Sequence, residues 1–252
     1  MVRVEIVIPV YNEEHALPLA IDTLVERLDG WEHDWRVTIV DNASTDATPE
    51  VGPALTDGAR VFYRRLEQKG RGRALKAAWL GSDADVMAYM DVDLSTDLEA
   101  LQPLVAALAN DGGFDVAVGS RSMGGSRVER SRRRRFLTWG YARLLRLALR
   151  VRFSDAQCGF KAVTRQAATA LLPLIENDRW FFDTELLVLA EKAGYRVKDI
   201  PVRWVEDKDS RVNIVSTILE DFGGVLRLVV SRPWRDVPAP APQASSAPAT
   251  PR

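Results

Sequence analysis

Runs rich in β-branched residues alternate with amphipathic helical patterns through the first 120 residues of the chain. This alternation predicts βαβ units, and therefore a mainly parallel sheet covered by helices on both faces. We expect strands at Val2 or Val4 to Val10 and at residues 35–41, 60–65, 85–91 and 114–120. We expect helices at residues 15–28, Ala74 to Leu80 and residues 98–110, the last opened by a capping box, Thr96-x-x-Glu99, with Asp97 inside it.

Polar or turn-forming residues follow four of these strands. In parallel α/β sheets, ligands bind beyond the carboxyl ends of the strands, so the four ends should converge on one crevice. The four ends are Pro9–Glu14, Asp41–Asp46, Asp91–Asp93 and Gly119–Arg121.

The Asp-Val-Asp segment that ends the fourth strand offers two carboxylates. In extended backbone, Asp91 and Asp93 point to the same side, where each raises the pKa of the other unless a cation neutralises them. Mg²⁺ and Mn²⁺ take oxygen ligands, commonly one or two carboxylates with substrate phosphates. The alternative is a solvated strand end whose acids cap the next helix.

The other strand ends suggest nucleotide contacts. Asp41 could accept hydrogen bonds from a base or ribose and Tyr11 could stack on a base, although helix-capping and turn roles explain these positions equally well. The loop around Lys69 and Arg71 is basic and glycine-rich, which suits a diphosphate at a helix start. Leu75 takes the third glycine position of a dinucleotide fingerprint, so that motif is incomplete. A solvated basic turn remains the alternative.

The second half of the chain carries a basic tract. Residues 131–154 hold eight arginines and no acid, and Arg143, Arg146 and Arg150 share one helical face. Such a face suits an anionic lipid surface or phosphate groups, or is simply solvated. The net charge of −1 disfavours nucleic acid as a partner. A second amphipathic pattern covers residues 212–230.

Three acids lie among apolar or aromatic residues, where acid–base or orienting work competes with capping as the explanation. They are Asp155, Asp183 and Glu185. Cys158 is the only cysteine, which excludes an intramolecular disulfide, and we expect it to be a packed side chain.

We expect one catalytic domain over residues 1–236, with a nucleotide half at about 1–121 and an acceptor or membrane-facing half at about 122–236. The Pro/Ala/Ser-rich residues 237–252 should form a disordered tail. The start has no secretory signal pattern and no apolar run approaches the roughly 20 residues of a bilayer span. These features predict a cytoplasmic protein, attached peripherally to the inner face of a membrane.

Several motifs together resemble family 2 glycosyltransferases with the GT-A fold, nearest to the dolichyl-phosphate β-glucosyltransferase branch of the polyprenyl-phosphate sugar transferases. The resemblance runs from about Val4 to about Leu228 and is carried by VIPVYNEE, VDNASTDAT, KGRGRALKAAW, DVDLSTDLEAL, VGSR, SDAQCGFKAVTR and WFFDTELLVLAEKAGYRVKDIPVRWVE. It implies inverting transfer of glucose or another hexose from a UDP- or GDP-linked sugar to a polyprenyl phosphate, with Mg²⁺ or Mn²⁺ as cofactor.

The resemblance also implies residue roles. The nucleoside diphosphate would contact Pro9, Tyr11, Glu13, Asp41, Lys69, Asp91, Val92 and Asp93, the metal being held by Asp91 and Asp93. Arg121 would contact phosphate and Asp155 would act as base or orienter. The acceptor phosphate or membrane would meet Arg132, Arg133, Arg134 and Arg135, and Asp183 and Glu185 would support the site from behind. Ser95 stands where the mannose synthase pattern has a Gln ligand, which weakens a mannose assignment.

Three alternatives remain open from the sequence. They are a transferase of the same fold with a soluble or glycan acceptor, a nicotinamide-dependent oxidoreductase, and a non-catalytic lipid- or nucleotide-binding module.

Overall fold

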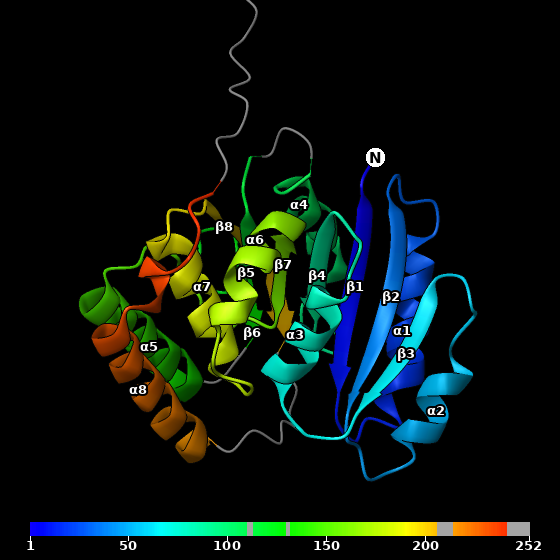
Figure 1. Ribbon diagram of the computed structural model, residues 1–252. Coiled ribbons are helices and arrows are strands. Elements are labelled where there is room, and N and C mark those ends of the chain that lie inside the picture. Colours follow the sequence, from blue (N-terminus) through cyan, green and yellow to red (C-terminus); the bar gives the residue numbers. More distant parts are fainter. Residues whose placement is uncertain (110–112, 130–131, 206–213, 241–252) are drawn as a thin grey trace, which may run out of the picture.

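Seven strands form one sheet in the order β3-β2-β1-β4-β7-β5-β8 (Figure 1). The structure is a computed structural model that describes residues 1–109, 113–129, 132–205 and 214–240, and describes only the backbone of residues 129, 132–137 and 214–218. The strands are β1 (Arg3–Val10), β2 (Asp34–Asn42), β3 (Val61–Leu66), β4 (Val86–Met90), β5 (Val116–Ser120), β7 (Phe160–Thr164) and β8 (Val197–Pro201).

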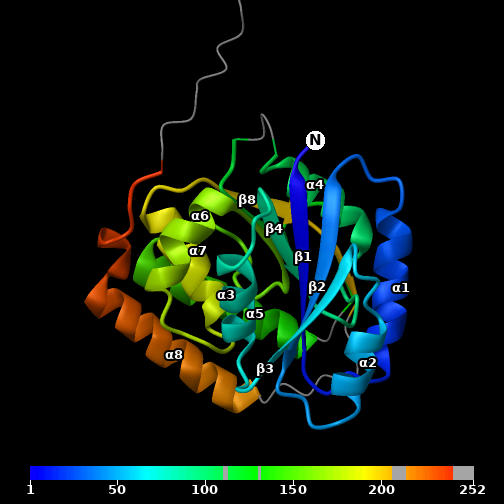
Figure 2. The same cartoon turned by 45° about the vertical axis from the view of Figure 1, so that its right-hand side comes forward.

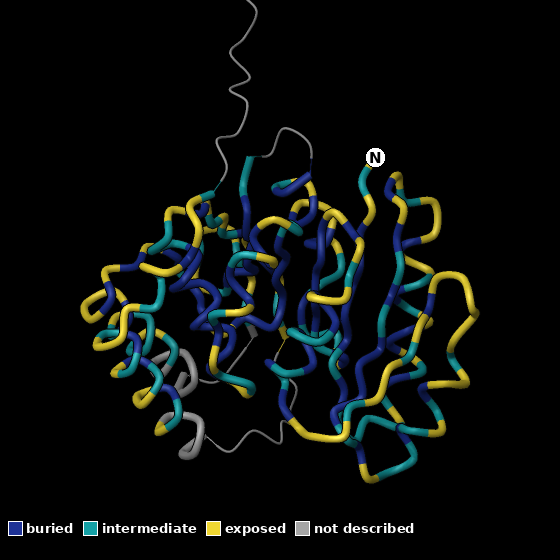
Figure 3. The backbone as a smooth tube through the Cα atoms, viewed as in Figure 1, coloured by how far each residue is buried: buried dark blue, intermediate teal, exposed yellow. Residues whose placement is uncertain are grey.

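The sheet is mainly parallel, which confirms the predicted fold class. β7 is inserted antiparallel between β4 and β5, while β1 with β2, β2 with β3, β1 with β4 and β5 with β8 pair in parallel. Every residue of β4 and β5 is buried, because helices cover both faces of the sheet (Figure 3). The first five strands were predicted, whereas β7 and β8 were not.

Helices lie on both sides of the sheet (Figures 1 and 2). The helices α1 (Ala16–Leu28) and α4 (Leu101–Ala106) cover one face, where a short 3₁₀ helix, η1 (Leu98–Ala100), pairs with α1 through Arg27 and Glu99 at 2.9 Å. The opposite face carries α3 (Arg71–Leu80), α6 (Arg165–Leu171) and α7 (Phe182–Lys192). The remaining short helices are α2 (Thr48–Ala54), η3 (Leu172–Leu174) and η4 (Pro233–Arg235).

Two long helices lie side by side beyond the β8 half of the sheet, α5 (Arg132–Leu149) and α8 (Ile214–Ser231). A separate two-stranded sheet pairs β6 (Arg127–Glu129) with β9 (Arg203–Val205). An isolated bridge between Thr96 and Trp204 attaches this small sheet to the segment that follows β4.

The start of η1 differs from the predicted capping box. The Asp97 carboxylate, and not the Thr96 hydroxyl, accepts the hydrogen bond from the Glu99 amide, at 3.0 Å. Thr96 is instead buried in the bridge to Trp204, so its backbone cannot begin the helix. Asp97 is therefore the capping acid itself.

The beginning of the predicted tail is packed on the domain. Val237 is buried, and the Pro238 carbonyl accepts a hydrogen bond from the Tyr195 hydroxyl at 2.9 Å. Residues 241–252 lie outside the described residues, so disorder there stays a prediction.

Candidate active site

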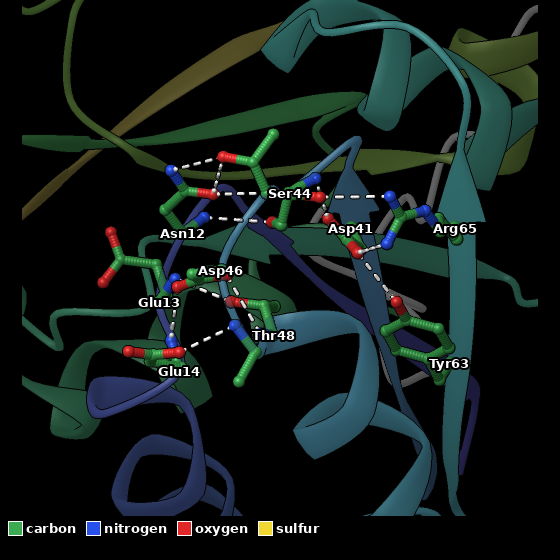
Figure 4. Close-up of polar contacts among 11 residues, drawn as sticks. Asn12, Glu13, Glu14, Asp41, Ser44, Asp46, Thr48, Tyr63 and Arg65 are labelled. Carbon is green, nitrogen blue, oxygen red and sulfur yellow. Dashed lines mark hydrogen bonds and ion pairs between the residues drawn. The ribbon is translucent and has the colours of Figure 1, made fainter.

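The loops that follow β1 and β2 are locked together, as expected for neighbouring parallel strands (Figure 4). The Asn12 amide donates to the Ser44 hydroxyl at 3.0 Å, and the Thr45 amide donates back to the Asn12 side chain at 2.8 Å. The Glu13 amide donates to the Thr48 hydroxyl at 2.9 Å. These bonds hold the two loops as one rigid unit at the carboxyl edge of the sheet.

Asp41 is fully buried and lies between Ser44 and the side chains of Tyr63 and Arg65 (Figure 4). Its carboxylate accepts hydrogen bonds from the Ser44 amide at 2.8 Å and the Tyr63 hydroxyl at 2.7 Å, and Arg65 approaches it at 3.4 Å. Burial, with the hydrogen bond to Asp41, raises the pKa of Tyr63 to about 12. The structure thus gives Asp41 three protein partners, and its contact with a nucleoside stays a prediction.

Tyr11, which directly follows β1, contacts Lys69. The Lys69 ammonium lies 3.7 Å from the centre of the Tyr11 ring and donates to the Tyr11 hydroxyl, a contact that lowers the pKa of the phenol. Pro9 is half-buried near the end of β1 and pairs with Val40 of β2. An aromatic face and a cation therefore stand together beside the strand end.

The Asp-Val-Asp segment is a turn, so the extended backbone predicted there is wrong. The Leu94 amide donates to the Asp91 carbonyl at 3.3 Å, and Leu94 has a positive φ of 51°. Val92 is buried, Asp93 is exposed, and the Asp91 side chain is 39% exposed. Burial raises the pKa of Asp91, the charge of Arg71 opposes this shift, and the nearby charge of Asp93 adds to it. The turn thus buries Val92 between two carboxylates that both stay at least partly exposed.

Arg71, the first residue of α3, lies against Asp91. Its Nη2 is 2.7 Å from the Asp91 Oδ1, while Lys69, two residues earlier, contacts Tyr11. The segment 69–71 therefore connects Tyr11, through Lys69, with the acidic turn at residues 91–93, through Arg71. A Cβ at Gly70 would overlap the Asp178 carbonyl oxygen, so only glycine fits this approach.

The loop between α5 and β7 reaches the same turn from the other side. A Cβ at Gly159 would overlap the Asp91 carboxylate and lie 2.6 Å from the Arg71 Nη2. Gly119, near the end of β5, has similarly little room: a Cβ there would lie 3.0 Å from the Cys158 sulfur. Glycine at these positions lets the loop pack directly against the acidic turn.

Arg121 and Asp155 form a buried two-point ion pair beside this loop. The Arg121 Nε and Nη2 lie 2.7 and 3.0 Å from the two Asp155 carboxylate oxygens, and the Arg121 amide donates to the same group at 3.1 Å. Burial alone would raise the pKa of Asp155, but the charge and hydrogen bonds of Arg121 outweigh it and hold that pKa below its usual value. The guanidinium also lies 5.3 Å from the Trp204 ring.

Asp183 and Glu185, in the first turn of α7, both lie behind the strand ends. Asp183 contacts Tyr89, Lys161 and Arg71, and so reaches Asp91 through one intervening side chain. Glu185 is fully buried, accepts from the Asn177 amide at 3.0 Å and pairs with Arg227 of α8 at 2.8 Å. Their supporting role stays a prediction, and the structure indicates how each could exert it.

Most of the basic tract lies on α5, but α5 ends at Leu149, so the prediction that Arg150 shares a helical face with Arg143 and Arg146 is wrong: Arg150 follows the helix with a positive φ of 54°. The backbone of Arg132, Arg133, Arg134 and Arg135 forms the first turns of α5, but their side chains lie outside the described residues. Farther along, α5 exposes Trp139 and Leu147, and Arg143 and Arg146 lie between them in the sequence and are also exposed. The adjacent α8 exposes an apolar stripe at helical spacing, formed by Leu219, Phe222, Leu226 and Val230. Among the described helices, none is both long and apolar enough to span a membrane.

Sequence reasoning missed two residues that the structure places at the centre of the site, Gly159 and Lys161. A lysine inside the apolar run CGFKAV was the available signal, because a buried lysine needs partners. In the described part of the chain, no group of three or more His, Cys, Asp or Glu side chains could hold a metal by itself.

Comparison with known proteins places this arrangement in a family context. The model of glycosyl transferase family 2 matches residues 5–172. The chain is 36% identical over 230 residues to glycosyltransferase AglD of Haloferax volcanii, covering 90% of this chain and 37% of that protein. It is 31% identical over 224 residues to a dolichyl-phosphate β-glucosyltransferase of Trichomonas vaginalis, covering 84% of this chain and 66% of that protein. The chain thus spans less than two thirds of the length of either relative.

Solved structures share the fold at lower identity. Glucosyl-3-phosphoglycerate synthase from Mycobacterium tuberculosis, in complex with Mn²⁺, UDP and phosphoglyceric acid, aligns with a TM-score of 0.67 at 19% identity, covering 94% of this chain and 80% of that one. A mannosyltransferase from Pyrobaculum calidifontis, in complex with GDP-Man and Mn²⁺, aligns with a TM-score of 0.59 at 21% identity, covering 95% and 66%.

Proposed function

The chain belongs to glycosyl transferase family 2, and we propose that it is an inverting transferase that moves a sugar from a nucleoside diphosphate sugar to a polyprenyl phosphate. One observation carries the proposal. The basic segment 69–71, the acidic turn 91–93 and the buried Arg121–Asp155 pair meet at the carboxyl edge of one sheet. The family favours glycosyl transfer over the nicotinamide-dependent alternative.

The donor half of the site follows from β1, β2 and α3. Tyr11 offers a face for a base, Asp41 and Glu13 line the same loops, and Lys69 brings a positive charge toward a diphosphate. The solved neighbours named above bind UDP or GDP-mannose. These observations support a UDP- or GDP-linked sugar as donor, with glucose or another hexose as the sugar.

The acidic turn suits Mg²⁺ or Mn²⁺. Asp91 and Asp93 offer two hard oxygen donors, Asp91 partly exposed and Asp93 exposed, and both metals commonly bind through one or two carboxylates plus substrate phosphates. When bound, the ion supplies charge neutralisation for the departing diphosphate. The Mn²⁺ in both neighbour structures supports this cofactor.

The acceptor half follows from Arg121, Asp155 and the loop to Gly159. An acceptor phosphate oxygen bonds to the anomeric carbon while the bond from that carbon to the diphosphate oxygen breaks, with inversion at the carbon. A phosphate monoester has its second pKa near 6, so the attacking oxygen is already ionised at neutral pH. Asp155 binds the Nε and Nη2 of Arg121 and so fixes the orientation of the guanidinium. The Nη1 of Arg121 takes no part in this pair and is the atom that would donate to the acceptor phosphate.

The lipid character of the acceptor rests on two further supports. The relatives include a dolichyl-phosphate β-glucosyltransferase that is similar over 84% of this chain. The exposed arginines of α5 and the apolar stripe of α8 lie on adjacent helices, as expected for a surface that binds anionic lipid. We therefore propose peripheral attachment to the cytoplasmic face of a membrane.

The test is product formation by the purified protein with a panel of UDP- and GDP-sugars, Mg²⁺ or Mn²⁺, and either a polyprenyl phosphate or a soluble phosphate monoester. We expect a glycosylated lipid phosphate, identified by mass spectrometry. Transfer to the soluble acceptor alone would replace the lipid proposal with a soluble-acceptor transferase.

A further inference from the structure

We propose that Asp183 is a positioning residue, a fixed counter-ion that holds Arg71 and Lys161 in place, and that it takes no proton from the acceptor. The inference rests on the proposed function and assigns a role to charges that lie beneath the site.

The Asp183 carboxylate is already surrounded by donors from the protein. Its Oδ1 accepts from the Lys161 ammonium at 2.8 Å and from the Tyr89 hydroxyl, while its Oδ2 faces the Arg71 Nε at 3.7 Å. The residue is 4% exposed. An acceptor oxygen therefore has no path to this carboxylate, whereas a general base must lie within hydrogen-bond reach of the proton that it removes.

Lys161 connects Asp183 with the loop on the acceptor side of the site. It is fully buried in β7, the antiparallel strand between β4 and β5. Its ammonium also donates to the Cys158 carbonyl at 2.6 Å. That carbonyl immediately precedes Gly159, which packs against Asp91. Lys161 thus ties Asp183 to the loop that carries Asp155.

Arg71 connects Asp183 with Asp91 on the donor side of the site. Its guanidinium joins Asp183 to Asp91, and it lies 4.9 Å from the Trp180 ring and 5.2 Å from the Tyr89 ring. The aromatic rings and the Asp183 carboxylate fix where this cation can stand. Asp183 is therefore the common partner of two cations, one facing the acidic turn and the other facing the acceptor loop.

The cost of such a cluster indicates a role beyond stability. Desolvating buried charges offsets much of their mutual attraction, and apolar residues of similar volume often replace a buried ion pair without loss of stability. A phosphate acceptor needs no strong base, because it is already ionised at neutral pH. The charges of Asp183, Lys161 and Arg71 are therefore explained by the positioning of neighbouring groups. Arg71 contacts Asp91 and Lys161 contacts the 155–159 loop, so both cations are needed to hold Asp91 in a fixed position relative to that loop.

The first experiment compares transfer by the wild type and by Asp183→Asn between pH 5.5 and 9. We expect kcat/KM to fall by about 100-fold, as for misplaced reacting groups, with an unchanged shape of the pH profile. A proton acceptor would give a different result: the variant would lose the acidic limb of the profile. That outcome overturns the proposal. Tyr89→Phe, which keeps all the charges, should show a smaller loss, again with an unchanged profile.

The second experiment measures backbone amide exchange over residues 155–161, which does not require transfer. Asp183→Asn and Lys161→Met should each raise exchange in this segment by about 10-fold or more, because the Cys158 carbonyl loses its anchored donor. The matched control is Glu5→Gln, which breaks a buried pair with Arg36 (2.8 Å) near the start of β1. It should leave exchange at 155–161 unchanged.

The two readouts separate the possible failures. If the wild type transfers no sugar, the proposed function fails while the exchange result still decides the role of Asp183. If exchange at 155–161 is unaffected by Asp183→Asn, the positioning role is wrong. A double variant, Lys161→Met with Asp183→Leu, tests whether the single variants lose transfer only because they are less stable. It should recover thermal stability relative to the single variants without recovering transfer, and recovery of both would make the cluster merely structural.

Discussion

Arg121 and Asp155 lie 34 residues apart in the chain and meet through two parallel hydrogen bonds of 2.7 and 3.0 Å, with the Asp155 side chain fully buried. Such a fork-to-fork pair fixes the orientation of the guanidinium as well as its charge. The arrangement makes Asp155 an orienting residue in our account.

Asp155→Asn should lower the free energy of unfolding by about 3–5 kcal/mol, because it leaves the Arg121 charge buried without its partner. Since the folded-state pKa of Asp155 is lowered, its contribution is present above about pH 4 and is lost as pH falls through the folded pKa. Denaturant unfolding at pH 7 measures the effect. The control Asp22→Asn, on the exposed side of α1, should change stability by less than about 0.5 kcal/mol. Equal effects of the two substitutions would contradict the buried pair.

Gly159→Ala should reduce transfer by about 100-fold, because the new Cβ overlaps the Asp91 carboxylate and must displace it. Steady-state rates with saturating donor measure the loss. The matched control is Gly140→Ala within α5, where a Cβ meets nothing within 4 Å and helix propensity improves. Full activity of Gly159→Ala would show that Asp91 is not confined by this loop.

Asp221 of α8 should make stability fall as pH rises. Burial, with the charge of Glu220, raises its pKa to about 7, and the Gln157 side chain donates to it at 2.9 Å. Between about pH 4 and pH 7 the folded state binds more protons at this carboxyl than the unfolded state, so the free energy of unfolding declines over that window.

The substitution Asp221→Asn removes this dependence and keeps an acceptor for Gln157. We expect a gain of roughly 1–3 kcal/mol at pH 8 and little change at pH 5, measured by denaturant unfolding at both values. A gain of the same size at both pH values would mean that the carboxyl does not titrate in this window.

Replacing Arg143, Arg146 and Arg150 together with Gln should weaken binding to anionic vesicles by about 100-fold at low salt, at about 1 kcal/mol for each charge. Co-sedimentation with phosphatidylserine vesicles measures the change. A charge-matched control removes three exposed arginines elsewhere, namely Arg3, Arg27 and Arg60. If both triple variants bind equally well, the surface of α5 and α8 is not the lipid-binding surface.

The positions of β1 to β5 along the chain could be predicted because each has its own apolar run, and their sequence of alternating strands and helices is typical of βαβ units. β7 and β8 were not predicted. β7 follows an irregular loop after α5 and runs antiparallel to both of its neighbours, so it is not part of a βαβ unit, and Lys161 interrupts its apolar pattern. The Thr96–Glu99 spacing predicted a capping box, but Thr96 forms a long-range bridge with Trp204 and does not cap the helix.

The same distinction applies to the site. Asp91, Asp93, Asp41 and Arg121 stand at strand ends, where local pattern and topology suffice to nominate them. The cluster around Asp183 depends on contacts between residues 22 and 94 positions apart, Lys161 and Tyr89. Only the packing of β4, β7 and α7 brings these side chains together, and no local signal specifies that packing.

The most direct test of the central claim is the rate of glycosyl-phosphate lipid formation by the wild type and by Asp91→Asn, with Mn²⁺ or with excess chelator. We predict product with the wild type and Mn²⁺, and a loss of at least about 100-fold with either the chelator or the variant, while both proteins keep the same unfolding temperature within a few degrees. Near-normal product formation by folded Asp91→Asn would contradict the assignment of the acidic turn to the metal and the diphosphate.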